Sequence, residues 1–178
     1  MNAGNIIAAH NSKILAKHYD EQNMYPKQNK STTNKRTCNC RKKNECPLNG
    51  DCNHEAVVYQ ATATTNQETA TYIGSTEGNF KRRFYGHKCD MNMYKNKCNT
   101  SLATFFWDNK TNNTTPTIKW KILEKCNKYK GATRKCDICL TEKLHILFNR
   151  DNPLNRRTEL MTRCPHLRKF KLEHVKVL

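Results

Sequence analysis

The chain has 178 residues, with 32 lysines and arginines against 15 aspartates and glutamates, a formal net charge of +17. This length predicts one domain, and a hydrophobic content of 36% predicts a small core. No apolar run reaches the roughly 18 to 20 residues that span a bilayer, and no apolar signal stretch opens the chain. We therefore expect no membrane partner, and thiols or metal thiolates rather than disulfides among the 10 cysteines. The positive charge predicts a polyanionic partner, with nucleic acid as the first candidate.

The chain begins with a polar segment, residues 1–37, that is predicted to be a linker or tail. Its second half is rich in Asn, Gln, Lys and Thr and offers little to bury. Beyond it we expect a cysteine-rich segment at 38–55, the main domain at 56–166 and a basic C-terminal tail at 167–178.

Two β-rich stretches, residues 56–61 and 71–74, are separated by a polar stretch and predict a hairpin. Residues 75–79 are predicted to form a turn that can also cap a helix. That helix would start at Phe80 and run into the 91–94 region. Its buried face would consist of Phe80, Phe84, His87, Met91 and Tyr94.

Three further elements complete the predicted domain. Thr100 or Ser101 could cap a second helix, residues 117–123 alternate like a third strand, and residues 139–149 have the apolar spacing of a third helix. This mixture of strands and helices predicts an α+β fold.

Four cysteines lie close together with the spacing Cys-x-Cys-x5-Cys-x5-Cys, at Cys38, Cys40, Cys46 and Cys52. Tetrahedral zinc takes four thiolate or imidazole ligands, and closely spaced cysteines on turns can supply them. We therefore predict a structural zinc site here, with His54 as a spare ligand. The alternative is a set of unrelated free cysteines, as we expect for Cys89 and Cys98, which fit no ligand pattern.

A second metal-type set combines a Cys-x2-Cys pair with two later residues: Cys136, Cys139, Cys164 and His166. Such a Cys3His site would tie the start of the third predicted helix to the C-terminal segment. His145 or Cys126 could replace His166. The sequence thus predicts about two structural Zn2+ ions.

A further group of residues follows a recognisable order. Val57-Val58-Tyr59 and Tyr72-Ile73-Gly74 lie on the two predicted hairpin strands, and Phe80-x2-Arg83-x3-His87 lies on the next helix. Glu142 and Asn155 follow. This order resembles the GIY-YIG nuclease family, whose name-giving tripeptides lie on adjacent strands of a three-stranded antiparallel sheet. The second tripeptide is intact here, and the first keeps its tyrosine.

Longer phrases are similar to the endonuclease domain of Penelope-like retroelements. They include Cys38-Asn39-Cys40-Arg41, Cys136-x2-Cys139-Leu140-Thr141-Glu142 and Leu154-Asn155-x-Arg157. The resemblance implies the GIY-YIG fold, flanked by helices, with zinc-stabilised N- and C-terminal segments. It also implies a divalent-metal-dependent DNA endonuclease that nicks one strand and leaves a 5′ phosphate and a 3′ hydroxyl. In such an element the 3′ hydroxyl primes reverse transcription at the target, so nuclear localisation and an element RNA or an upstream reverse transcriptase as partners are further expectations.

The resemblance also implies roles for individual residues. Glu142 would hold Mg2+ or Mn2+, and Arg83 would bind the scissile phosphate. Tyr72 would be the general base, with Tyr59 hydrogen-bonding nearby, and His87 would relay or accept a proton. Because a free phenol has a pKa of about 10, a tyrosine base needs a cation close by. Asn155 would orient the site, and the DNA backbone would be contacted by Lys81, Arg82, Lys88, Arg156 and Arg157.

Two other functions fit the same residues. A zinc-dependent nucleic-acid-binding module with an inactive nuclease fold would explain the basic composition and the altered first tripeptide. A structure-specific repair nuclease would prefer flaps or branched DNA.

Overall fold

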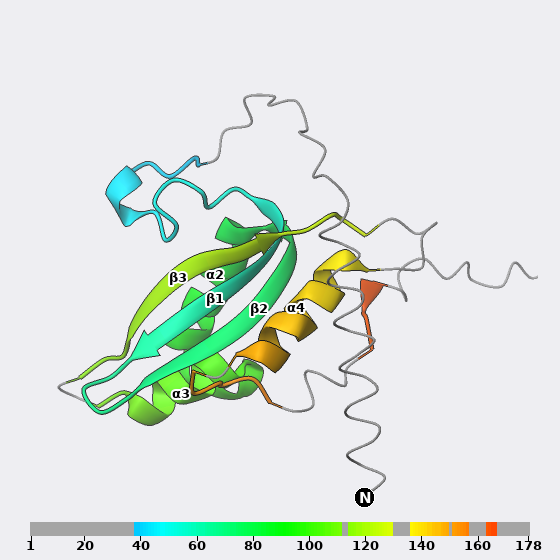
Figure 1. The fold of residues 1–178 in the computed structure, drawn as a ribbon. Helices are drawn as coiled ribbons and strands as arrows, with labels where there is room; N and C mark the ends of the chain where they lie inside the picture. The colour runs from blue at the N-terminus through cyan, green and yellow to red at the C-terminus, as the bar shows by residue number, and fades with distance from the viewer. Residues whose placement is uncertain (1–37, 112–113, 130–135, 150, 157–162, 167–178) are drawn as a thin grey trace, which may run out of the picture. The chain divides into compact units, whose positions relative to one another are not determined.

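The computed structural model describes residues 38–111, 114–129, 136–149, 151–156 and 163–166, all of which belong to one compact unit. Three strands and three α-helices form the framework of the described residues (Figure 1), which confirms the predicted α+β fold class. The 1–37 segment and the 167–178 tail lie outside the described residues, so their predicted roles stay predictions. Within the described part, no helix is long and apolar enough to cross a membrane.

The sheet is antiparallel throughout and has the strand order β2-β1-β3. Its strands are β1 (Glu55–Thr64), β2 (Thr69–Asn79) and β3 (Thr117–Lys125). The predicted hairpin of β1 and β2 is confirmed. However, the turn predicted at residues 75–79 is wrong, because β2 continues through them to pair with the start of β1, where Val57 faces Thr76 and Glu55 faces Asn79.

Two of the three α-helices begin at side-chain caps. Asn79 accepts a hydrogen bond from the Arg82 amide at 2.9 Å and starts α2 (Phe80–Asn92), while Thr100 accepts one from Ala103 at 3.1 Å and starts α3 (Ser101–Asn109). Both caps agree with the prediction. The third helix, α4 (Asp137–Phe148), begins two residues before the predicted Cys139.

Two short 3-10 helices complete the description: η1 (Lys43–Glu45) and η2 (Tyr94–Asn99). The predicted place of Tyr94 on the buried face of α2 is wrong, because α2 ends at Asn92 and Met93 is extended. Tyr94 therefore lies in η2, where it is 66% exposed.

The helices pack on both faces of the sheet. Tyr59, Ala61 and Tyr72 share one face because side chains alternate along a strand and these residues are in register. That face packs against Phe80 of α2 and Leu102 of α3. Val58 and Ile73 point to the other face and pack against Ile138 and Ile146 of α4. Tyr59 and Tyr72 therefore lie on the sheet face that packs against α2 and α3, and α4 packs against the opposite face.

Candidate active site and metal centres

A buried hydrogen-bonded cluster joins Tyr59 of β1 to α2. The Nε of Arg83 donates to Tyr59 Oη at 3.0 Å, and Tyr59 Oη lies 2.8 Å from His87 Nε2. Tyr59 and His87 have no exposed surface. Because Arg83 and His87 lie one helical turn apart, both side chains can reach the same phenol.

Burial and charge set the protonation of this cluster. Burial, together with the nearby Arg83 cation, lowers the pKa of His87 to about 3, so the imidazole is neutral at physiological pH. Burial also raises the pKa of Tyr59 to about 12, although Arg83 acts in the opposite direction. Among the described residues, His87 Nδ1 is a buried nitrogen without a hydrogen-bond partner. Buried polar atoms without a partner are rare in native cores.

Arg83 also connects the cluster to Tyr72. Burial acts to lower the pKa of Arg83, but hydrogen bonds and charge interactions with the Tyr59 and Tyr72 phenols raise it overall. The rings of Tyr72 and His87 pack edge to face, with centroids 5.8 Å apart. The structure thus brings Tyr59, Tyr72, Arg83 and His87 together from three elements of the chain.

Gly74 leaves the space that the Tyr59 ring occupies. A Cβ atom at position 74 would lie 2.6 Å from Tyr59 Oη and 3.0 Å from the Tyr72 ring. Real Cβ atoms do not approach other atoms so closely, and the conflict involves two buried rings. Glycine at the end of the Tyr72-Ile73-Gly74 tripeptide is therefore required by packing of the two tyrosines. The motif alone did not indicate this packing role of Gly74.

Alanine at position 74 should destabilise the fold by about 1 to 3 kcal/mol, because the Tyr59 ring must shift. Urea unfolding measures the loss. Gly86 is the matched control, since it lies in the middle of α2 with nothing within 4 Å of its added Cβ. Gly86→Ala should raise stability by up to about 1 kcal/mol. Equal effects of the two variants would contradict the packing role of Gly74.

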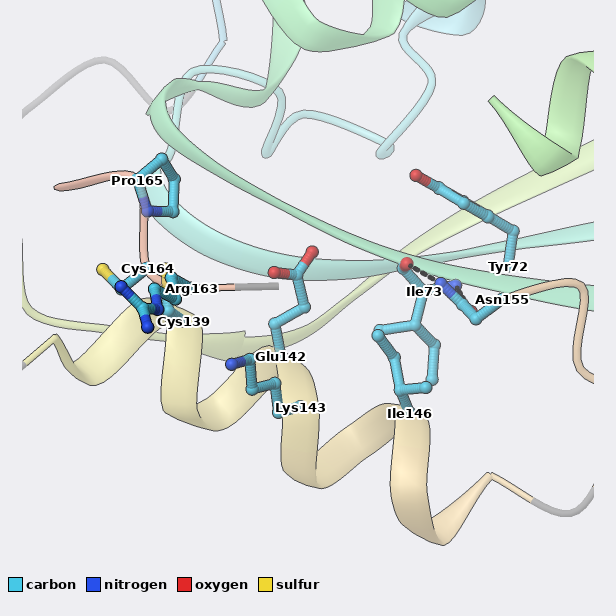
Figure 2. A pocket seen from close by; sticks show the side chains of 10 residues that line it. All are labelled: Tyr72, Ile73, Cys139, Glu142, Lys143, Ile146, Asn155, Arg163, Cys164 and Pro165. Atoms are coloured by element: carbon cyan, nitrogen blue, oxygen red, sulfur yellow. Dashed lines mark hydrogen bonds between the residues drawn. The ribbon is translucent and has the colours of Figure 1, made fainter. Parts of the chain in front are cut away.

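A pocket of about 230 Å³ lies where α4 meets β2, and it holds Glu142 and Tyr72 (Figure 2). The Glu142 carboxylate points away from the axis of α4 toward β2. Glu142 is the acidic residue among the described lining residues, and Lys143 and Arg163 add positive charge. The negative charge of Glu142 also acts to raise the pKa of Tyr59. One carboxylate in an open pocket suits Mg2+, which usually takes one or two protein carboxylates and keeps several waters.

Asn155 holds the backbone beside Tyr72. Its Oδ1 accepts from the Ile73 amide, and its Nδ2 donates to the Ile73 carbonyl, both at 2.8 Å (Figure 2). The segment around it also pairs with β2, since Leu154 donates to the Thr71 carbonyl at 2.7 Å. Asn155 therefore covers the free edge of β2 and positions Tyr72 through the backbone.

The first cysteine set forms a compact group of sulfur atoms: Cys38, Cys40, Cys46 and Cys52. Three of its sulfur pairs are 3.5, 3.6 and 3.7 Å apart. A tetrahedron with zinc–sulfur bonds of about 2.3 Å has edges of about 3.8 Å, so the spacing fits zinc. Disulfide sulfurs lie about 2.05 Å apart, so the spacing does not fit disulfides. This group could hold a zinc ion.

A turn prepares Cys46 for metal binding. Gly50 adopts a φ of +112°, which lets its amide donate to Cys46 Sγ at 3.2 Å. Burial acts to raise the pKa of Cys46, but hydrogen bonds from the Gly50 and Leu48 amides lower it to about 7. The thiolate, which is the form that binds metal, is therefore favoured.

The second set also forms one group: Cys136, Cys139, Cys164 and His166. His166 Nδ1 lies 3.3 Å from the sulfur of Cys136, 3.3 Å from that of Cys139 and 3.7 Å from that of Cys164. Tetrahedral zinc with one imidazole ligand requires nitrogen–sulfur distances of about 3.6 Å, so this group could hold a second zinc ion. The other ring nitrogen of His166, Nε2, lies 3.4 Å from a Glu77 carboxylate oxygen. A carboxylate in this position would orient the ring of a metal-ligating histidine, and the sequence did not point to Glu77.

The alternative ligands are occupied elsewhere. His145 pairs with Glu124 at 3.3 Å, and His54 lies 3.2 Å from Asp51. Cys126 is outside both groups, and Cys89 and Cys98 are exposed free thiols, as expected. The structure therefore selects His166 from the options that the spacing left open.

The predicted DNA-contacting residues are spread over two surfaces. Lys81, Arg82 and Lys88 belong to α2, where Arg82 and Lys88 are exposed, and Arg156 is exposed after the Asn155 segment. Arg157 lies outside the described residues. Arg163, which was not singled out from the sequence, lines the pocket next to Cys164 of the second metal group.

Comparison of the chain with protein-family models, with curated proteins and with solved structures yields no match. The α+β fold, its small antiparallel sheet and the two groups able to hold zinc therefore rest on the structure itself.

Proposed function

We propose that the chain is a divalent-metal-dependent DNA endonuclease of the GIY-YIG type. The observation that carries the proposal is the meeting of Tyr59, Tyr72, Arg83 and His87 beside the pocket of Glu142. Phosphodiester hydrolysis needs an activated water, neutralisation of charge on the phosphate and help for the leaving oxygen. A phenol, a guanidinium and a carboxylate in one place provide groups for each need.

In the proposed mechanism Tyr72 is the general base, because it lines the open pocket while Tyr59 is fully buried. Arg83 binds the scissile phosphate through its remaining guanidinium N–H groups and favours the phenolate form of the tyrosines. Tyr59 accepts a hydrogen bond from Arg83 and holds it in place, and neutral His87, hydrogen-bonded to the same phenol, would accept or relay a proton. Glu142 would hold Mg2+ or Mn2+, and such an ion would stabilise the charge on the phosphate and the leaving oxygen.

The proposed substrate is duplex DNA, nicked in one strand with a 5′ phosphate and a 3′ hydroxyl as products. One candidate site per described unit suits nicking better than double-strand cleavage. Use of the 3′ hydroxyl to prime reverse transcription, with an element RNA or reverse transcriptase as partner in the nucleus, is part of the same proposal and rests on the sequence resemblance alone.

The direct test is the nicking of supercoiled plasmid by the purified chain in Mg2+ or Mn2+, with EDTA as the metal-free control. Tyr72→Phe keeps the ring but removes the proposed base, and should slow nicking by about 10²- to 10⁴-fold. Tyr94→Phe, on exposed η2, should nick at the wild-type rate.

Three other results would each change the proposal in a different way. Salt-sensitive DNA binding without cleavage under either metal would establish the inactive binding module instead. Equal cleavage by wild type and Tyr72→Phe would remove Tyr72 from the mechanism. Cleavage of flaps or branched DNA without nicking of plain duplex would favour the repair-type nuclease.

A further inference from the structure

A second concave surface, which we call the α2 groove, lies between the first cysteine-rich segment and the outer side of α2. Its volume is about 790 Å³. Arg41 and Lys42 line it from the cysteine-rich side, and Lys81, Tyr85 and Lys88 line it from α2. The α2 groove shares no lining residue with the pocket of Glu142.

Helix geometry separates the α2 groove from the candidate active site. Lys81, Tyr85 and Lys88 have the i, i+4, i+7 spacing of a single helix stripe. Arg83 points to the buried tyrosines, and Tyr85, two residues on, lies about 200° further round the helix. One helix therefore presents a phosphate-binding arginine to the site and a basic stripe to the groove.

The α2 groove is held in shape by contacts between its two walls. Lys81 Nζ donates to Asn39 Oδ1 at 2.8 Å, and the Lys81 amide donates to the Cys52 carbonyl at 2.7 Å. These bonds fix the cysteine-rich segment against the first turn of α2. The cations of both walls therefore face one space.

Tyr85 is an exposed aromatic ring in this charged setting. It is 51% exposed, and its ring lies 5.7 Å from that of Phe84. Phe84 in turn packs edge to face on Trp120 at 5.7 Å, so the support under Tyr85 is part of the core. An anchored, exposed tyrosine offers a flat surface on which a planar ring can stack.

The charge of the residues that line the α2 groove indicates the class of ligand that it would bind. Arg41, Lys42, Lys81 and Lys88 line the α2 groove against one acid, Glu45, which pairs with Lys42 at 2.9 Å. Cations that follow a groove and an aromatic ring that can stack on bases are the combination by which proteins bind single-stranded nucleic acid. A paired duplex hides the faces of its bases, so an exposed ring in a groove favours an unpaired strand.

We propose that the α2 groove binds an unpaired DNA strand, with a base stacked on Tyr85 and phosphates on Arg41, Lys81 and Lys88. The inference rests on the proposed nuclease function and specifies its substrate. The preferred DNA has a single-stranded segment beside the duplex that is nicked, with the two parts held on opposite sides of α2.

Binding is measured in the full chain carrying Glu142→Gln, so that cleavage does not remove the probe. Fluorescence anisotropy compares the affinity for a labelled 12-nucleotide oligodeoxythymidine with the affinity for a blunt duplex of equal length. Tyr85→Ala should weaken single-strand binding by about 5- to 100-fold, the effect of losing one stacked base, and change duplex binding less than twofold. The control Tyr94→Ala, on a different exposed tyrosine, should change neither affinity more than twofold.

Salt dependence tests the phosphate contacts separately. Arg41→Gln should reduce the slope of log K against log salt for the oligodeoxythymidine by about 0.7, the value for one phosphate contact on a single strand. An unchanged single-strand affinity in Tyr85→Ala would overturn the proposal, as would an equal loss for duplex. Displacement of the strand by polyglutamate at equal charge concentration would also overturn it in favour of an acidic peptide.

These outcomes are independent of catalysis. If wild type fails to nick plasmid while Tyr85→Ala selectively loses single-strand binding, the nuclease proposal fails and the strand-binding groove stands. If wild type nicks plasmid and Tyr85→Ala binds single strands normally, the groove assignment fails alone.

Discussion

Glutamine in place of Glu142 should reduce plasmid nicking by about 10³-fold or more, while zinc content and thermal stability stay at wild-type values. The substitution keeps the size of the side chain and one acceptor oxygen but removes the charge that would bind the cation. Electrostatic stabilisation of developing charge by one group is typically worth 10²- to 10³-fold in rate, and metal-ion catalysis several kcal/mol. The nicking rate should be measured across a range of Mg2+ and Mn2+ concentrations.

Glu124→Gln is the matched control. Glu124 lies on β3 and pairs with His145, and it does not line the pocket of Tyr72. Its loss should change the nicking rate by less than about twofold. If Glu142→Gln and Glu124→Gln nick equally fast, Glu142 holds no catalytic metal and the proposed mechanism fails.

Serine in place of Cys139 should remove one of two bound zinc ions and lower the melting temperature by about 10 °C or more. Structural zinc contributes folding free energy directly, and loss of a ligand from a buried site costs several kcal/mol. For a domain of this size each kcal/mol shifts the melting temperature by about 2 to 4 °C. Cys139 lies in the first turn of α4, one turn before Glu142, so nicking should fall as well.

Metal analysis and thermal melts measure these effects, and Cys89→Ser is the control because Cys89 is exposed and outside both groups. Cys52→Ser should remove the other zinc ion and leave the Cys136 group loaded. A wild-type chain without zinc and without free thiols would contradict both metal assignments, because it would show disulfides in their place.

Local patterns predicted most of the secondary structure correctly. The caps at Asn79 and Thr100 form because a side-chain oxygen reaches an amide three residues ahead, which sequence spacing alone defines. The length of β2 was not predictable in this way. Residues 75–79 include glycine and asparagine, which favour turns, yet they form strand because the beginning of β1 lies opposite and supplies hydrogen-bond partners.

The two candidate metal groups show the same difference between local spacing and tertiary packing. The cysteine spacing predicted all four members of the first group, with His54 as a spare ligand, because these residues lie close together in the chain. The second group needed the structure, since His145 and His166 were both compatible with the spacing. Packing of α4 places His145 against Glu124 of β3, and only His166 joins the three sulfurs.

The sequence by itself determined the excess of positive charge, the two sets of metal-type cysteines and the order of tyrosines, arginine, histidine and glutamate along the chain. These features depend on composition and spacing, which folding does not change. Only the tertiary structure decided that Arg83 contacts both tyrosines, that Gly74 makes room for Tyr59, and that Tyr85 faces a basic groove. Each of these depends on residues brought together from separate elements, by the pairing of β1 with β2 and by packing of helices and the cysteine-rich segment.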